Sequence, residues 1–261
     1  YLSEEQPWER SLIYAWNKYN HGELISVPHS PNLRFWDIFN FYEKETFYQN
    51  KNDIPMPNKV ALNNKEIIFE FSKFFPKERI IEVEALRYVW LNKLSLKSMQ
   101  LDTKKLKKVL ILGDYLYEPT NKLLNAYNDI QLKDQNITFS FKPHPNQPMQ
   151  DIYPQLPREY GLMNDIILDY DVFFCGNMTY ASVDGYLAGL DVVVLQDSRS
   201  LNISPLNKDQ AKFVFNGSEL NEYLEILNKE KKVETQKLSI GRKDLLFLDE
   251  DLHRWQSFLE N

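Results

Sequence analysis

A histidine held between two prolines is the first feature of this sequence that could take part in chemistry. The segment Lys142-Pro-His144-Pro145 follows an apolar run that reads as a strand. Because proline fixes its own φ angle and restricts the residue before it, the imidazole is held in place. A held imidazole beside a lysine suits an anionic oxygen. The alternative is a ring that simply hydrogen-bonds a loop carbonyl.

A second polar segment, Gly176-Asn-Met-Thr179, follows another apolar run and leads into a predicted helix that contains Ser182. Hydroxyl groups and free amides at the start of a helix bind anions, although Thr179 could equally be an ordinary N-cap. Two such segments after two strands favour a phosphate site over either structural alternative. The candidate residues for binding a phosphorylated donor are Lys142, His144, Asn177, Thr179, Ser182 and Asp114.

A parallel sheet would bring these segments together. From Lys104 onward, short apolar runs alternate with helical patterns, as in βαβ units. Strands are expected at 109–112, 137–141, 171–175, 192–195 and 213–215, and helices at about 119–130, 179–188, 218–227 and 249–259. Asp114, after the first strand, could hold a ribose hydroxyl or merely cap its turn. We therefore predict an α/β, Rossmann-like, doubly wound parallel sheet, with its ligand site beyond the carboxyl ends of the strands.

The first hundred residues read differently from the rest. Helices are expected at 8–16, 64–74 and from Val83 to Leu94, strands at 23–28 and 59–62, and a structured loop region over 31–58. These strands are too few for a second doubly wound domain. We therefore expect a mainly helical, partial domain over 1–103 and a nucleotide-binding domain over 104–261 that includes the terminal helix. Because the chain begins with Tyr1, we also expect it to be a piece of a longer protein.

Composition narrows the classes of partner. With 31 Lys and Arg against 37 Asp and Glu, the net charge is -6, which argues against a general nucleic-acid binder. One cysteine, Cys175, excludes a disulfide framework and fits a reducing compartment. No apolar run approaches the roughly 18 residues of a membrane span. Neither a dinucleotide-binding nor a P-loop glycine pattern occurs, which argues against NAD binding and P-loop ATP hydrolysis.

Together, Lys142–Pro145 and the segment Asn177–Val194, with its Thr179-Tyr-Ala-Ser182, resemble the nucleotide-sugar half of GT-B glycosyltransferases. The likeness is to bacterial surface-carbohydrate enzymes, including sialyltransferase-like, polysialyltransferase-like and Kdo-transferase-like groups. In those families the His-Pro histidine and a Ser or Thr hydroxyl hold the phosphate of a CMP-sugar. The resemblance maps these roles onto His144 and onto Thr179 or Ser182.

The resemblance also implies an architecture and a set of partners. The fold would be a GT-B C-terminal lobe plus part of an N-terminal lobe. The substrate would be a nucleotide-sugar, perhaps CMP-linked, with a glycan or lipid-linked acceptor. No nucleic-acid partner, no further cofactor and no metal are expected. The implied location is the cytoplasm, at the inner face of the membrane if the acceptor draws the protein there.

A general base for the acceptor is the least defined part of this hypothesis. The base motif of sialyltransferases is not found in the sequence. Glu5 is one candidate, although its position also suits the first turn of a helix, where the dipole favours carboxylates. His29, held near Pro28 and Pro31, is a similar candidate for contact with the acceptor. Two other functions stay open: a nucleotide-sugar epimerase of the same fold, and a non-catalytic partner in polysaccharide assembly.

Overall fold

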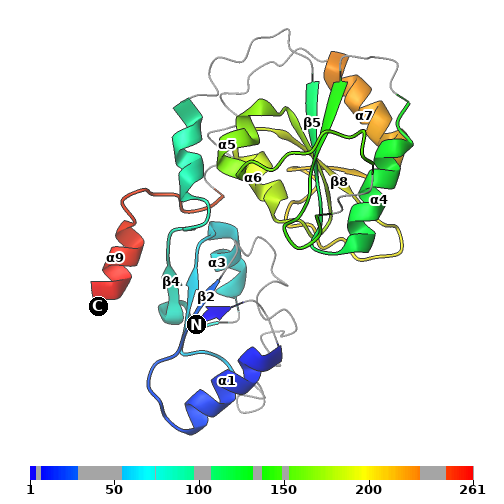
Figure 1. The fold of residues 1–261 in the computed structure, drawn as a ribbon. Coiled ribbons are helices and arrows are strands. Elements are labelled where there is room, and N and C mark those ends of the chain that lie inside the picture. The colour runs from blue at the N-terminus through cyan, green and yellow to red at the C-terminus, as the bar shows by residue number, and fades with distance from the viewer. Residues whose placement is uncertain are drawn as a thin grey trace. The chain divides into compact units, whose positions relative to one another are not determined.

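The computed structural model describes residues 1–3, 7–28, 55–73, 75–96, 107–131, 137–148, 153–229 and 245–260. The chain divides into two compact units, one made of residues 1–92 and 243–261 and the other of residues 93–242. Each unit is built on a parallel sheet accompanied by helices (Figure 1). None of the helices in the described ranges has both the length and the apolar character of a membrane span.

The first unit contains a four-stranded parallel sheet in the order β1-β2-β3-β4. Its strands are β1 (Leu2–Ser3), β2 (Ile25–Pro28), β3 (Lys59–Leu62) and β4 (Ile80–Glu82). Its helices are α1 (Pro7–Lys18), α3 (Lys65–Phe71), the 3-10 helix Lys77–Arg79, the start of the 3-10 helix Val89–Leu96, and α9 (His253–Glu260). A buried cluster that includes Val60, Phe71 and Phe75 joins β3 to α3 and to the residues that follow it.

The sequence predicted a mainly helical region over 1–103 with two strands, and the structure adds β1 and β4, which complete a parallel sheet with β2 and β3. Strands β1 and β4 have two and three residues, too few to show the alternation that marks a strand in a sequence. Of the helix expected from Val83 to Leu94, the second half is present as the 3-10 helix Val89–Leu96, but Val83–Tyr88 is not helical. Tertiary partners use this backbone instead: Val83 N–H donates to Leu62 O at 3.0 Å, and Ala85 N–H donates to Phe247 O at 2.8 Å.

The terminal helix α9 belongs to the first unit. The expected domain boundaries had assigned it to the second domain, 104–261. Its first turn is held by Glu84, whose side chain is fully buried. Glu84 Oε1 accepts hydrogen bonds from the Arg254 backbone N–H at 3.0 Å and from Arg254 Nη1 at 3.1 Å. Oε2 accepts one from Trp255 N–H at 3.1 Å. A polar residue distant in sequence thus satisfies the free amides of this helix start.

The second unit contains a five-stranded parallel sheet in the order β6-β5-β7-β8-β9. The strands are β5 (Lys107–Leu112), β6 (Ile137–Lys142), β7 (Val172–Gly176), β8 (Asp191–Leu195) and β9 (Lys212–Val214). The helices are α4 (Tyr117–Asn128), α5 (Met163–Ile166), the 3-10 helix Ile167–Asp169, α6 (Ala181–Leu187) and α7 (Gly217–Lys229). The predicted doubly wound parallel sheet is confirmed, with all five expected strands present.

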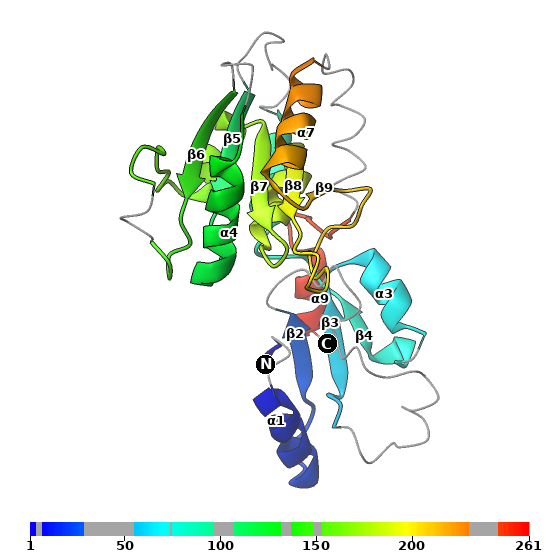
Figure 2. The same ribbon diagram turned by 90° about the vertical axis from the view of Figure 1, so that its right-hand side faces the viewer.

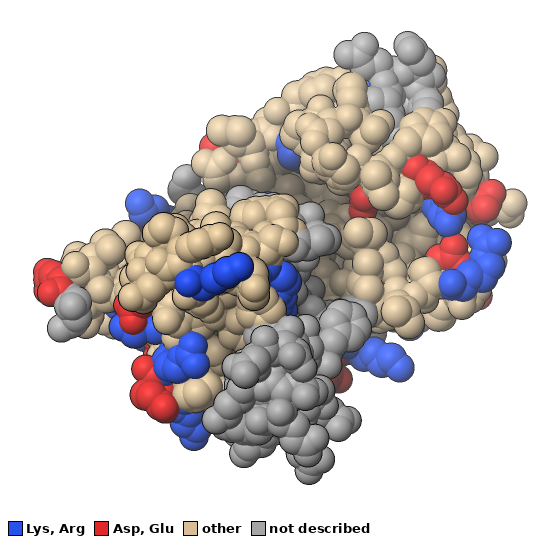
Figure 3. Space-filling view, turned by 90° about the horizontal axis from the view of Figure 1, so that it is seen from below, with Lys and Arg blue, Asp and Glu red and all other residues tan. Residues whose placement is uncertain are grey.

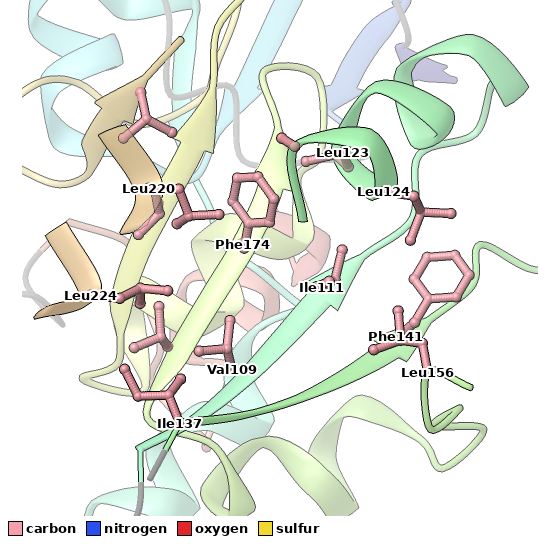
Figure 4. Close-up of a cluster of buried hydrophobic side chains, with 14 of the residues drawn as sticks. Val109, Ile111, Leu123, Leu124, Ile137, Phe141, Leu156, Phe174, Leu220 and Leu224 are labelled. Atoms are coloured by element: carbon pink, nitrogen blue, oxygen red, sulfur yellow. The ribbon is translucent and has the colours of Figure 1, made fainter. Parts of the chain in front are cut away.

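Apolar residues on alternate positions of the strands cover this sheet on both faces. Val109 and Ile111 of β5 and Phe174 of β7 pack with leucines of α4 and α7 (Figure 4). In Figure 2, α4 and α7 are seen over this face of the sheet. On the opposite face, Gly185 of α6 lies so close to Phe173 that a Cβ atom there would come within 2.4 Å of the ring.

Candidate functional site

The strand order places a topological switch point between β5 and β7. The chain passes from β5 to β6 on one side, and then crosses to β7 on the other side of β5. In open parallel sheets, ligands bind beyond the carboxyl ends of the strands at such a point. We refer to the residues that end or directly follow β5–β8 as the carboxyl edge: Gly113–Tyr115, Lys142–His144, Gly176–Thr179 and Gln196–Arg199.

Gly113 allows two parts of the carboxyl edge to meet. Its N–H donates to Lys142 O at 2.9 Å, which extends the β5–β6 pairing by one residue. A Cβ atom on residue 113 would lie 3.0 Å from His144 N and 3.3 Å from Lys142 O. The absence of a side chain therefore lets the end of β6 approach the end of β5.

His144 lies in a tight turn that fixes both its position and its proton. Gln147 N–H donates to His144 O at 2.8 Å, with Pro145 inside the turn. His144 Nδ1 accepts the Asn146 N–H at 3.2 Å, so the neutral ring carries its proton on Nε2. The Tyr115 ring meets the imidazole edge-on, with centroids 5.6 Å apart. The half-buried ring therefore offers an N–H donor from Nε2.

The Lys142 side chain, expected from the sequence to bind an anionic oxygen of a ligand, contacts the protein instead. Its ammonium group donates a hydrogen bond to the Gly161 carbonyl. Burial lowers the pKa of Lys142, and the nearby Glu159 carboxylate opposes that shift. The lysine thus anchors residues 159–161, and its ammonium group already has a protein partner.

Asp114 and Thr179 are brought together across the switch point. Asp114 is 3% exposed, and the Thr179 hydroxyl donates to its Oδ2 at 3.3 Å. Leu116 N–H donates to Asp114 Oδ1 at 3.1 Å, which holds the carboxylate in a turn. Directly below, burial and then the Asp114 charge raise the pKa of the Cys175 thiol, so this cysteine is an unreactive part of the core.

The remaining two candidates support the loops of the carboxyl edge. The Ser182 hydroxyl is buried and donates to Thr179 O at 2.6 Å, so it fixes the turn that carries Thr179. Asn177 Nδ2 donates to Leu201 O at 3.1 Å and lies 3.4 Å from Gln196 Oε1. Asn177 therefore ties the end of β7 to the loop after β8.

Sequence reasoning missed a group of charges after β8. Lys122 of α4 forms an ion pair with Asp197 at 2.9 Å and another with Glu118 at 3.3 Å. The Arg199 backbone N–H and the Lys122 ammonium hold the pKa of Asp197 well below its usual range. Asp197 comes two residues after the end of β8, as Asp114 does after β5. The rule that polar residues after parallel strands meet at one edge could therefore have predicted Asp197 as well. Lys122 gave no such signal because it lies within a helix.

Two cavities lie within single units. In the second unit, a cavity of about 540 Å³ is lined by the loop after β8 and by β9, including Asp197, Lys208 and Phe215. In the first unit, a cavity of about 430 Å³ is lined by Asn63, Arg87 and Trp255 among others. On the face seen in Figure 3, acidic and basic side chains are interspersed, and the described residues there form no broad patch of one sign.

Metal-binding patterns occur away from the carboxyl edge. Glu84, Asp249 and His253 lie close enough to share an ion, but Arg254 already bonds both carboxylates. The sequence also holds two Asp-x-Asp triplets, a pattern that can clamp a metal ion, at 169–171 and 249–251. The first precedes β7 at the opposite end of the strand, where Asp171 Oδ2 accepts the Lys108 N–H at 2.9 Å. A metal-independent reaction stays a prediction.

The two catalytic candidates Glu5 and His29 lie outside the described residues. Of the six donor-site candidates, Asp114, Thr179 and His144 lie at one end of the sheet, and Gly113 allows the segment of His144 to approach that of Asp114. Lys142, Asn177 and Ser182 hold the loops that carry them. The site therefore has an N–H donor on one side of β5 and a carboxylate–hydroxyl pair on the other.

Several solved structures resemble this chain in fold. One from Listeria monocytogenes, assigned as a UDP-N-acetylglucosamine 2-epimerase, matches with a TM-score of 0.58 and 12% identity over 95% of this chain and 70% of that chain. Arabidopsis thaliana UGT89C1, complexed with UDP, matches with a TM-score of 0.57 and 14% identity over 96% and 69%. Acinetobacter baumannii MurG matches with a TM-score of 0.56 and 10% identity over 95% and 70%.

The chain has a GT-B fold. Two parallel-strand α/β units, matched over nearly the whole chain, carry that assignment. At identities of 10–14%, the likeness establishes the GT-B architecture alone. No protein-family model and no curated protein matches the sequence. The narrower resemblance to sialyltransferase-like and Kdo-transferase-like groups stays a prediction.

Proposed function

We propose that this chain is a GT-B glycosyltransferase, or the donor-binding part of one, that moves a sugar from a nucleotide-sugar to a glycan or lipid-linked acceptor of a bacterial surface polysaccharide. The observation that carries the proposal is that His144 and the Asp114–Thr179 pair lie at the same end of the second sheet, on the two sides of β5. The fold supports it, because similar solved structures include one complexed with UDP. The resemblance of the sequence to CMP-sugar enzymes makes CMP the second nucleotide to test.

His144 would stabilise the leaving phosphate. Glycosyl transfer develops negative charge on the phosphate oxygen as the bond to the sugar breaks, and a held donor lowers the energy of that state. The Nε2–H of His144 is such a donor, because its other ring nitrogen is already bonded to Asn146. The ring needs no rotation to present this proton, since the turn and Tyr115 fix its orientation.

The acceptor would occupy the first unit. Its cavity of about 430 Å³ lies at the carboxyl ends of the strands of that sheet and carries Arg87 at its surface and Trp255 in its wall. An aromatic ring beside a cation suits a sugar that bears a carboxylate or phosphate. Glu5 and His29 remain our candidates for the general base that takes the proton of the acceptor hydroxyl.

A nucleotide screen tests the proposal directly. We expect CMP or UDP, or one of their sugars, to raise the thermal unfolding midpoint of the wild-type chain, whereas GDP serves as the comparison nucleotide. His144→Ala should weaken binding at least tenfold in calorimetry, the loss of one hydrogen bond to a charged group. His21→Ala is the matched control, because His21 is an exposed histidine of the first unit. Equal affinity of His144→Ala and wild type would refute the site.

An epimerase is the second candidate, because a protein assigned as a sugar-nucleotide epimerase shares the fold. The two activities differ in their need for an acceptor. An epimerase converts the nucleotide-sugar alone into an isomer that keeps its phosphate bond, whereas a transferase releases the nucleotide. Product analysis of the bound nucleotide-sugar with and without added glycan acceptor separates them.

A further inference from the structure

A buried carboxylate lies directly behind the Thr179 hydroxyl group. Asp114 is 3% exposed, and its Oδ2 lies 3.3 Å from Thr179 Oγ1. Its other oxygen, Oδ1, accepts the Leu116 N–H at 3.1 Å. A carboxylate only accepts hydrogen bonds, and a hydroxyl group has a single proton to donate. The proton of the Thr179 hydroxyl is therefore directed inward, to Asp114.

This direction decides what the outer side of Thr179 can bind. Once its proton is given to Asp114, Oγ1 keeps two lone pairs, which only accept hydrogen bonds. Within the described part of the chain, no side chain or amide donates to these lone pairs. Thr179 is only half-buried and belongs to the carboxyl edge, where a ligand would approach it. A ligand group that meets it must bring its own proton.

We propose that the Asp114–Thr179 pair recognises a hydroxyl group of the nucleotide-sugar and not its phosphate. The inference rests on the proposed function, and it changes the role that the resemblance gives to Thr179. Phosphate oxygens bear no proton to offer at neutral pH, and the Asp114 charge behind Thr179 repels an anion placed against it. A hydroxyl of the ribose or of the transferred sugar meets both conditions.

The phosphate then belongs on the other side of β5. His144, after β6, presents Nε2–H because Nδ1 is occupied by the Asn146 amide. Strands β6 and β7 are separated by β5, which corresponds to about 10 Å between them. A single phosphate group does not span that distance. The donor at His144 and the acceptor at Thr179 therefore suit two different groups of one ligand.

The isosteric change Asp114→Asn tests the direction of the hydroxyl. Leu116 N–H still requires an oxygen partner, so the amide oxygen takes the place of Oδ1. The amide nitrogen then faces Thr179 and donates to it, which turns the threonine proton outward. The variant keeps the shape of the site and exchanges an acceptor for a donor. It should therefore change which ligand group is preferred.

Calorimetry with CMP, UDP, UDP-N-acetylglucosamine and inorganic phosphate provides the measurement. For whichever nucleotide binds wild type, Thr179→Val and Asp114→Asn should each weaken binding about tenfold, while Thr179→Ser stays within about threefold. Inorganic phosphate should bind Thr179→Val as it binds wild type, and should bind Asp114→Asn equally or more tightly. Thermal unfolding of each variant checks that it is folded, and Thr179→Ser supplies a folded reference that keeps the hydroxyl.

The arms of the experiment also identify the hydroxyl. If the variants weaken the binding of UDP but not of 2′,3′-dideoxy-UDP, the recognised hydroxyl belongs to the ribose. If they weaken only the binding of UDP-N-acetylglucosamine, the hydroxyl belongs to the transferred sugar. Either result upholds the inference. Nucleotide affinity unchanged in both variants, or phosphate weakened as much as the nucleotide, overturns this inference alone. If no nucleotide binds to the wild-type chain, the proposed function fails and this inference fails with it.

Discussion

Removal of the Glu84 side chain should release helix α9 from the first unit. In Glu84→Ala, the Arg254 and Trp255 amides and the Arg254 guanidinium lose the acceptor that lies 3.0–3.1 Å away. Losing this buried acceptor costs about 3–5 kcal/mol, because two backbone amides lose their partner and Arg254 keeps only the exposed carboxylates of Asp249 and Glu82. Since every 1.4 kcal/mol is tenfold, the undocked population of α9 should rise roughly a hundred- to several thousand-fold.

Backbone amide hydrogen exchange across residues 253–260 measures this population. We expect α9 to exchange faster in Glu84→Ala by a factor of that order, with β5 and β7 of the second unit unchanged. The exchange rate of α9 in Glu84→Gln should lie between those of wild type and Glu84→Ala. In this variant the side-chain oxygen still accepts from Arg254, but the amide nitrogen faces the Trp255 N–H and cannot accept from it.

The matched control is Asp251→Ala. It also removes a carboxylate near the start of α9, but this side chain is 74% exposed. Such a surface change should alter stability by about 0.5 kcal/mol or less. If Glu84→Ala exchanges no faster than Asp251→Ala, then Glu84 does not hold the helix and the assignment of α9 to the first unit is refuted.

Two further predictions concern the second unit. Asp197→Asn should remove a contribution to stability that depends on pH. The Arg199 amide and Lys122 hold the pKa of Asp197 below its unfolded value of about 3.9. The difference in unfolding free energy between wild type and variant should therefore be fully present above that pH and shrink as the pH falls below it. Urea unfolding between pH 7 and pH 3 measures it, and a difference that grows on acidification contradicts the reasoning. Gly185→Ala should destabilise the unit by about 1–3 kcal/mol, since the new Cβ atom would lie 2.4 Å from Phe173, and full stability in that variant would show that α6 can shift without cost.

The second unit could be predicted from the sequence because its central strands β5, β7 and β8 have five or six residues and bury most of them. Runs such as Val109–Leu112 and Val192–Leu195 are continuous and apolar, and every expected strand is present. In the first unit the strands at 23–28 and 59–62 and the helices at 8–16 and 64–74 were also predicted, whereas β1 and β4 are too short for a pattern and pair only through the fold. Its terminal helix depends on Glu84, a residue about 170 positions earlier. No local signal links two such segments.

The site was predicted as a place more accurately than as a set of contacts. The rule that polar residues after parallel strands meet at one edge placed His144, Asp114 and Thr179 at one end of the sheet, where the structure has them, while their binding of a ligand stays a prediction. The same residue types gave no indication of which partner each side chain takes. Lys142 donates to the Gly161 carbonyl and Ser182 to the Thr179 carbonyl, although both were expected to face the ligand. Those choices depend on backbone oxygens whose positions only the folded loops define.

The discontinuity of the first unit has a consequence for how the protein is made. Residues 1–92 leave the ribosome first, but α9 follows only after all 150 residues of the second unit, 93–242, have been synthesised. The second unit is continuous and can fold while translation proceeds. The first unit must wait, with the Glu84 carboxylate and the surface that Trp255 later covers still open to solvent. The first unit therefore completes its fold only after the second unit has been synthesised.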